Sequence, residues 1–168
     1  MEQEIMKTLC VLASSLVTLL MNMPAFAQPK AVLSAKAIPA TLTVTPGAKT
    51  TLKVQLTIQS PYHVNANPAS MRFLIPTVIT LDKAQGMSVG KPLYPKGTLK
   101  KFTFFPTPLA VYQGNTVVSV PLSAAKTLSA GPHQLTGLVK YQACNDRVCL
   151  APTTAKFAVT LQVAKGHH

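Results

Sequence analysis

Hydrophobic and polar residues alternate along most of the chain. The segment "TLKVQLTIQ", residues 51–59, places Leu52, Val54, Leu56 and Ile58 on one side of an extended backbone and polar side chains on the other. Because successive side chains of a β-strand point to opposite faces, this period of two predicts a half-buried strand. The same alternation predicts strands at residues 40–44, 72–81, 100–105, 115–122, 134–143 and 155–163.

Short turn-forming sequences separate the predicted strands. They are "PGAK", "QGMSVGKP", "YPKG", "YQGN" and "SAGPH", which supply the residues that chain reversals need. No segment carries a long period of about 3.6 residues, so a helical domain is not expected. Strands that recur about every 8–12 residues are typical of sandwiches. We therefore predict an all-β fold, an immunoglobulin-like antiparallel β-sandwich.

The first 27 residues have the pattern of a secretory signal peptide. Lys7 precedes the apolar run "LCVLASSLVTLLMNM", and Ala25 and Ala27 occupy the small-residue positions before a cleavage site. The run is shorter than the ~20 apolar residues of a spanning helix, so an uncleaved membrane anchor is the weaker alternative. We expect cleavage after Ala27, export to the periplasm, and no membrane span in the mature chain.

The mature chain is expected to hold one domain. About 140 residues remain after cleavage, which is enough for a single hydrophobic core. Residues 28–37, "QPKAVLSAKA", are interpreted as a loose N-terminal arm, and residues 38–165 as the β-sandwich domain.

Basic residues dominate the charge of the chain. Its formal net charge is +12, and the mature part contains only two acidic residues, Asp82 and Asp146. The lysines are spread singly or in pairs, without the aromatic clusters of a protein that reads nucleic acid. We therefore expect a solvated basic surface, a monomer, and no nucleic-acid partner. Attraction to acidic partners or anionic lipid stays open.

Two cysteines remain in the mature chain, Cys144 and Cys149, because Cys10 lies within the signal sequence. A close pair of cysteines in an exported protein indicates a disulfide. A structural zinc site usually closes with four ligands, so the pair does not suggest one. Neither a metal site nor a cofactor is expected.

The spacing of the two cysteines requires a chain reversal. Five extended residue steps span ~16 Å, whereas a disulfide joins Cα atoms that lie ~4.4–6.8 Å apart. The intervening "NDRV" suits a reversing loop. The disulfide would then close a hairpin between the predicted strands at 134–143 and 155–163.

The purpose of this disulfide stays open on geometry alone. So small a ring stabilises a fold by only ~2 kcal/mol in the loop-entropy estimate. At an edge loop, the bond would be open to attack by another protein's thiolate. Arg147 would favour a thiolate and Asp146 would oppose it. A structural staple and a redox-active disulfide are equally compatible with these observations.

The cysteine segment resembles a known family. "YQACNDRVCLAP" is similar to the active-site segment of the N-terminal periplasmic domain of DsbD, the thiol:disulfide interchange protein. That segment combines Tyr-Gln, a small residue, two cysteines around a short polar loop, and one or two prolines. The upstream segments "PYHVNANPAS", "FLIPTVITL", "YPKG" and "LAVYQGNTVVSVPL" resemble its preceding strands, so the similarity extends over residues 38–163.

The resemblance implies an immunoglobulin-like domain with a redox-active disulfide. In the family, this domain receives electrons from a thioredoxin-like domain that is fed by a membrane-embedded thiol carrier. It passes them to oxidised periplasmic partners, such as disulfide isomerases and thioredoxin-like proteins of cytochrome c maturation. By motif position, Cys149 would form the mixed disulfide with partners and Cys144 would resolve it. The chain would be a stand-alone electron-transfer module of the protein-disulfide reductase type.

The resemblance also implies roles for residues around the cysteines. The family shields its cysteines with a cap loop that bears an aromatic residue, and "FFPTPL" places Phe104 or Phe105 in this role. A core phenylalanine is an equally good interpretation of either. His63 falls in a segment that lies near the cysteines in the family, and it would tune a thiolate pKa. An ordinary strand histidine is the alternative. Tyr141 is the tyrosine of the Tyr-Gln motif.

Two other functions fit parts of the sequence. A secreted immunoglobulin-like binding module would use the disulfide as an inert hairpin staple, with a reduction potential below about −300 mV. A Cu(I) chaperone would combine Cys144, Cys149 and His63 with Met71 or Met87. The methionines lack clustered spacing, which makes the copper function the weakest of the three.

Overall fold

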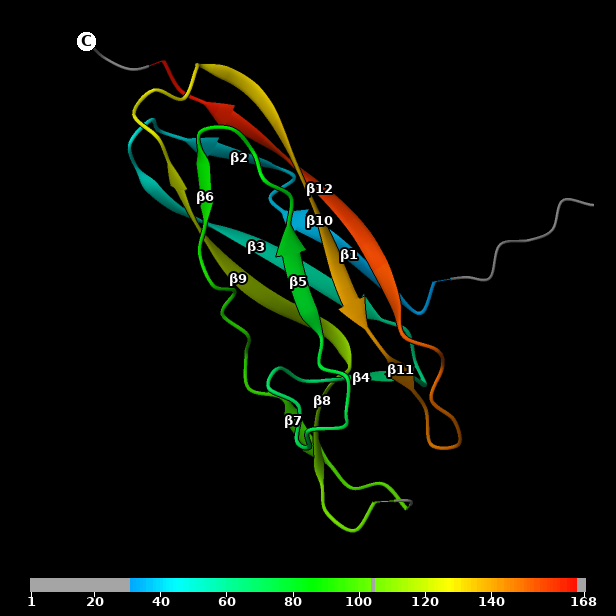
Figure 1. The fold of residues 1–168 in the computed structure, drawn as a ribbon. Helices are drawn as coiled ribbons and strands as arrows, with labels where there is room; N and C mark the ends of the chain where they lie inside the picture. Colours follow the sequence, from blue (N-terminus) through cyan, green and yellow to red (C-terminus); the bar gives the residue numbers. More distant parts are fainter. Residues whose placement is uncertain (1–30, 104, 166–168) are drawn as a thin grey trace, which may run out of the picture. The chain divides into compact units, whose positions relative to one another are not determined.

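The computed structural model describes residues 31–103 and 105–165 (Figure 1). The regular secondary structure of these residues consists of β-strands, without a helix. None of these residues belongs to a helix with the length and apolarity that a membrane crossing requires. The strands are β1 Leu33–Ile38, β2 Thr41–Val44, β3 Lys49–Ile58, β4 His63–Asn65, β5 Val78–Leu81, β6 Met87–Val89, β7 Thr98–Lys100, β8 Leu109–Tyr112, β9 Gly114–Ala124, β10 Gly131–Tyr141, β11 Ala143–Cys144 and β12 Thr153–Val163.

Two four-stranded sheets form the sandwich. One has the strand order β1-β3-β9-β6 and the other the order β2-β12-β10-β5. A third, smaller sheet has the order β11-β4-β8-β7 and lies at one end of the long strands (Figure 1). The two long sheets enclose the core, and the small sheet receives the segment that carries Cys144.

The alternating pattern along the strands places the core between the two long sheets. In β3, the side chains of Leu52, Val54, Leu56 and Ile58 are buried while Lys53 is exposed, as the period of two predicts. The second halves of β9, β10 and β12 alternate in the same way. Removal of these side chains from water is the main force that holds the sheets together.

The predicted fold class is confirmed, with one strand pair that runs parallel. Adjacent strands of the described sheets pair antiparallel except β2 and β12, whose parallel register runs from Thr41↔Thr160 to Val44↔Val163. Although β2 follows β1 in the chain, it joins the opposite sheet beside the last strand. Side-chain alternation shows which face of a strand is buried, but it does not name the partner strand or its direction.

The expected loose arm at residues 28–37 is wrong for its second half. Leu33 begins β1, which pairs antiparallel with β3 along its whole length. Leu33 is completely buried and Ala37 nearly so. The alternation in this segment rests largely on alanines, whose small apolar surface gives a weak hydrophobic signal. The sandwich therefore starts at β1, while residues 28–30 and the predicted signal peptide at 1–27 lie outside the described residues.

The predicted strand at 72–81 is shorter than expected. Only Val78–Leu81 forms a strand. Pro76 has no N–H group to offer to a ladder. The carbonyl of Ile75 accepts a hydrogen bond from Nδ2 of Asn65 at 3.0 Å, so a side chain takes the place of a neighbouring strand. The segment before β5 is consequently a loop that lies against β4.

The predicted strand at 100–105 is displaced towards the N-terminus. β7 ends at Lys100, and Phe102 turns into a small apolar cluster with Leu109 and Val111 of β8. Side-chain alternation did not predict β4, β6 and β8 as separate strands, although the family resemblance covers the segments that contain β4 and β8. Each has only three or four residues, which is too few to show a period.

The variant Leu33→Ala tests whether β1 belongs to the sandwich. It leaves a cavity between the sheets, so the free energy of unfolding should fall by about 2–5 kcal/mol. Leu99→Ala removes the same atoms from a side chain that is 66% exposed, and it should change stability by less than about 0.5 kcal/mol. Urea unfolding followed by circular dichroism measures both. A Leu33→Ala variant as stable as the unchanged protein would support the loose arm after all.

Candidate functional site

The two cysteines lie in the loop that connects β10 to β12. The strands pair along the whole of β10, and the last pair is Tyr141↔Thr153. The chain then leaves β12, and β11 pairs with β4, which sets Cys144 opposite His63. A disulfide joins Cys144 to Cys149, with the Sγ atoms 2.03 Å and the Cα atoms 4.0 Å apart. The predicted chain reversal is confirmed, and the predicted disulfide is present.

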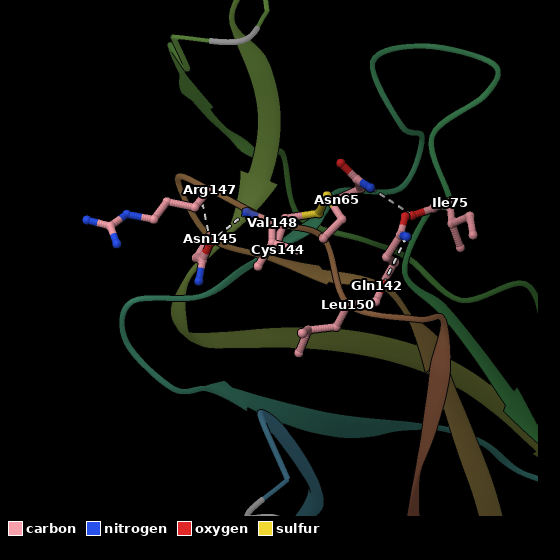
Figure 2. Close-up of a disulfide and its surroundings, with 9 residues drawn as sticks. Asn65, Ile75, Gln142, Cys144, Asn145, Arg147, Val148 and Leu150 are labelled. Carbon is pink, nitrogen blue, oxygen red and sulfur yellow. Dashed lines mark hydrogen bonds between the residues drawn. A yellow bond between two sulfur atoms is a disulfide. The ribbon is translucent and has the colours of Figure 1, made fainter.

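Asn145 shapes the reversing loop (Figure 2). Its Oδ1 accepts hydrogen bonds from the backbone N–H groups of Arg147 and Val148, each at 2.9 Å. The Asn145 N–H group donates to the Val148 carbonyl at 2.9 Å, and the Leu150 N–H group donates to the Ala143 carbonyl at 2.8 Å. Asparagine suits such a turn because its short side chain reaches the backbone a few residues further on. The loop is therefore held by its own hydrogen bonds in addition to the disulfide.

The two cysteines differ in their exposure to solvent. Cys144 is only 6% exposed, whereas Cys149 is exposed on the returning side of the loop. Its neighbours Val148 and Leu150 are exposed hydrophobic residues. Thiol–disulfide exchange depends on access to the sulfur atom that is attacked. Of the two residues, Cys149 is therefore the more accessible to another molecule.

His63 lies beside Cys144 within the small sheet. It is 2% exposed, and its ring stacks on the ring of Phe102 with the centroids 4.4 Å apart. The ammonium group of Lys100 lies 5.3 Å from the centroid of the Phe102 ring. Burial lowers the pKa of His63, the charge of Lys100 lowers it further, and Asp146 acts in the opposite direction. The imidazole is therefore predominantly neutral at pH values around seven.

The charged residues of the loop remain in contact with solvent. The side chain of Asp146 is 75% exposed, and one carboxylate oxygen lies 3.9 Å from the Lys100 ammonium group. An exposed pair of this kind contributes little to stability. The Arg147 side chain extends away from the disulfide (Figure 2), so its effect on a thiolate stays a prediction. No group of three or more His, Cys, Asp or Glu side chains is placed to hold a metal ion within the described residues.

The Tyr-Gln motif anchors the segment that precedes the cysteines. Tyr141 belongs to the main hydrophobic cluster and is 3% exposed. Burial raises the pKa of its hydroxyl group, and a hydrogen bond with the Leu33 backbone has the opposite effect. The side-chain amide of Gln142 has a partner as well, since its Nε2 donates to the Leu150 carbonyl at 3.1 Å (Figure 2). Tyr141 thus contributes to packing between the sheets, and Gln142 joins the two sides of the cysteine loop.

The predicted aromatic cap is described only in part. Phe104 lies outside the described residues. Phe105 is partly buried and stacks on Phe73, with the ring centroids 6.3 Å apart. The aromatic residue that stacks on His63 is Phe102, which the family resemblance does not single out. Its alternation with Phe104 in "KFTFF" is the sequence signal that could have drawn attention to it.

The fold and the site define a class of protein. An immunoglobulin-like sandwich whose hairpin loop carries a disulfide, with one cysteine buried and the other exposed, has the features of a thiol–disulfide interchange domain. The family of the N-terminal domain of the thiol:disulfide interchange protein DsbD matches residues 29–161. The chain belongs to this family, which confirms the resemblance seen in the cysteine segment.

Solved structures are similar to this chain at low sequence identity. The N-terminal periplasmic domain of ScsB from Proteus mirabilis is 11% identical, with 82% of this chain and 49% of that chain covered and a TM-score of 0.46. BcpA, the major pilin subunit of Bacillus cereus, is also 11% identical, with 80% and 40% covered and a TM-score of 0.43. The chain thus spans about half of the ScsB structure. No curated protein matches the sequence.

Limited alkylation tests the difference in exposure between the cysteines. After the disulfide is reduced under native conditions, iodoacetamide should modify Cys149 before Cys144, because Cys149 is an exposed residue and Cys144 is buried. Peptide mass spectrometry at successive times measures the two rates. In urea-unfolded protein the rates should converge, which separates burial from intrinsic reactivity. Earlier modification of Cys144 in the native protein would contradict the assignment of Cys149 as the reactive residue.

Proposed function

We propose that this domain passes reducing equivalents from a thioredoxin-like or membrane-bound thiol donor to oxidised periplasmic proteins through the Cys144–Cys149 pair. The observation that carries the proposal is the exposed Cys149 bonded to a buried Cys144. Membership of a thiol:disulfide interchange family supports it. Disulfide isomerases and thioredoxin-like proteins of cytochrome c maturation are the acceptors that the resemblance suggests.

Two displacement reactions make up the exchange. In the reduced domain, the Cys149 thiolate attacks one sulfur of the partner's disulfide, and the partner's second sulfur leaves as a thiolate. Cys144 then gives up its proton and attacks the Cys149 sulfur. The partner's first sulfur leaves, so the partner is reduced by two electrons and the Cys144–Cys149 disulfide forms again. A dithiol donor reduces that disulfide by the same two steps in reverse.

The surface around Cys149 supports contact with another protein. Val148 is 52% exposed and Leu150 is 37% exposed, so two apolar side chains flank the reactive sulfur. Their burial against a partner would stabilise a short-lived complex and exclude water from the exchanging sulfur atoms. The signal peptide predicted for residues 1–27 would bring the domain to the periplasm, a compartment in which disulfides persist.

Capture of a mixed disulfide tests the proposed function. Cys144→Ala removes the resolving thiol, so this variant should accumulate a covalent complex with a thioredoxin-like periplasmic protein that lacks its own resolving cysteine. Cys149→Ala retains only the buried thiol and should capture much less. Non-reducing electrophoresis with mass spectrometry of the linked peptides measures both yields.

The unchanged protein is the matched control for the capture experiment. It should form no lasting complex, yet it should change the oxidation state of the intact partner. If neither variant captures a partner, and the unchanged protein neither oxidises nor reduces one, the exchange function is wrong. The disulfide would then be the inert staple of a secreted binding module.

The proposed cap is tested at Phe104 and Phe105 separately. If one of them covers the disulfide, its replacement by Ala should speed reduction by a small thiol such as dithiothreitol, because the reagent gains access to the sulfur. Alkylation of the thiols released over time measures the rate. Rates that are unchanged in both variants would show that neither phenylalanine shields the disulfide.

A further inference from the structure

A buried ring nitrogen of His63 has no hydrogen-bond partner. Nδ1 is shielded from solvent, and no donor or acceptor among the residues that the structure describes is bonded to it. His63 is the one described side chain in this situation. Buried polar atoms are nearly always paired, because an unpaired one has lost its bonds to water without a replacement. We therefore looked for a group that could bond to Nδ1 of His63 when the disulfide is reduced.

Cys144 is the residue directly opposite His63 in the strand register. His63 and Cys144 face each other across the antiparallel β4–β11 pair. Residues in direct register have Cβ atoms ~4.5–5.5 Å apart, on the same face of the sheet. Nδ1 is bonded to Cγ of His63, and Sγ is bonded to Cβ of Cys144, so both atoms stay close to the paired strands. Stacking on Phe102 restricts the orientation of the imidazole ring.

The redox state of Cys144 decides whether it can pair with His63. In the disulfide, Sγ carries no hydrogen. Reduction turns it into a thiol, which is a weak hydrogen-bond donor. A neutral histidine that holds its proton on Nε2 accepts at Nδ1. Reduction thus supplies, directly opposite His63, a donor that the disulfide lacks.

The surroundings of His63 favour the neutral form of its imidazole ring. Burial is the largest effect, and Lys100 of β7 adds to it, so both lower the pKa of His63 below its usual value. Asp146 of the cysteine loop acts in the opposite direction. Because the folded-state pKa is lowered, the neutral ring predominates at neutral pH and is lost only as the pH falls through that value.

We propose that His63 is the proton acceptor for Cys144, the resolving thiol of the exchange function proposed above. The Cys144 S–H proton passes to Nδ1 of His63 as Sγ of Cys144 attacks the Cys149 sulfur of a mixed disulfide. The bond between Cys149 and the partner's sulfur breaks, and the partner leaves as a thiolate. The imidazolium then gives its proton to that thiolate or to water. In the reverse direction, the imidazolium of His63 protonates Sγ of Cys144 as the bond between Cys144 and Cys149 breaks.

A chromogenic disulfide separates the two steps without a protein partner. Reduced protein is mixed with one equivalent of dithiobis(nitrobenzoate), and the release of the coloured thiolate is followed by stopped-flow absorbance. Attack by Cys149 gives a first phase and a mixed disulfide. Attack by Cys144 on that mixed disulfide gives a second phase. The rates are recorded across the pH range in which histidine and cysteine titrate.

The variant His63→Gln should affect the second phase alone. At neutral pH the second-phase rate should fall by about 100-fold, within the usual range for loss of a general base. Its pH dependence should also move upwards, towards the ordinary titration of a cysteine thiol. The first phase should keep its rate, because Cys149 is exposed and does not depend on the buried ring. His133→Gln, at a partly exposed histidine of β10, should leave both phases unchanged.

The variant His63→Phe separates proton transfer from packing. It keeps an aromatic ring against Phe102 but accepts no proton, so its second phase should be as slow as that of His63→Gln. A wild-type second phase in His63→Phe, or an unshifted pH profile in both variants, would overturn the proposal. Circular dichroism checks that each variant is folded. If His63→Gln does not fold, the second phase of His63→Phe tests the proposal. Since no partner protein takes part, failure here leaves the mixed-disulfide capture above unaffected.

Discussion

The pairing of β11 with β4 is the contact on which the rest of the site depends. β10 and β12 form a long hairpin, and a straight continuation would carry both cysteines beyond the sandwich. Instead, the chain changes its partner after Tyr141, and the two residues of β11 join the small sheet. This change draws Cys144 into the protein. The disulfide and the Asn145 turn then bring Cys149 back on the outer side of the loop.

The resulting asymmetry divides the chemistry between the two sulfur atoms. In the proposed exchange, the exposed Cys149 meets partners, and the buried Cys144 reacts with its neighbour in the same loop. Burial of Cys144 would keep it from competing with Cys149 for the partner, because exchange depends on access to the sulfur. The same ring stabilises the fold only slightly, because so few residues lie between the cysteines. In the proposed function, the position of the disulfide therefore matters more for reactivity than for stability.

The environment of Cys144 is assembled from separate parts of the chain. His63 comes from β4, Phe102 follows β7, and Asp146 belongs to the cysteine loop, where it lies near Lys100. These segments meet because β4 is paired on one side with β11 and on the other with β8, which in turn pairs with β7. The small sheet, rather than the main core, thus determines which side chains surround the buried sulfur.

Local sequence signals determined the strand-rich fold, the inward faces of β3, β9, β10 and β12, and the chain reversal between the cysteines. Each depends on side-chain alternation or turn chemistry within a few residues. The structure alone showed that β1 completes a sheet, that β2 runs parallel to β12, and that Phe102 stacks on His63. It also showed that Cys144 is buried and Cys149 exposed. These features depend on contacts between segments far apart in the chain, and periodicity carries no information on which strands become neighbours.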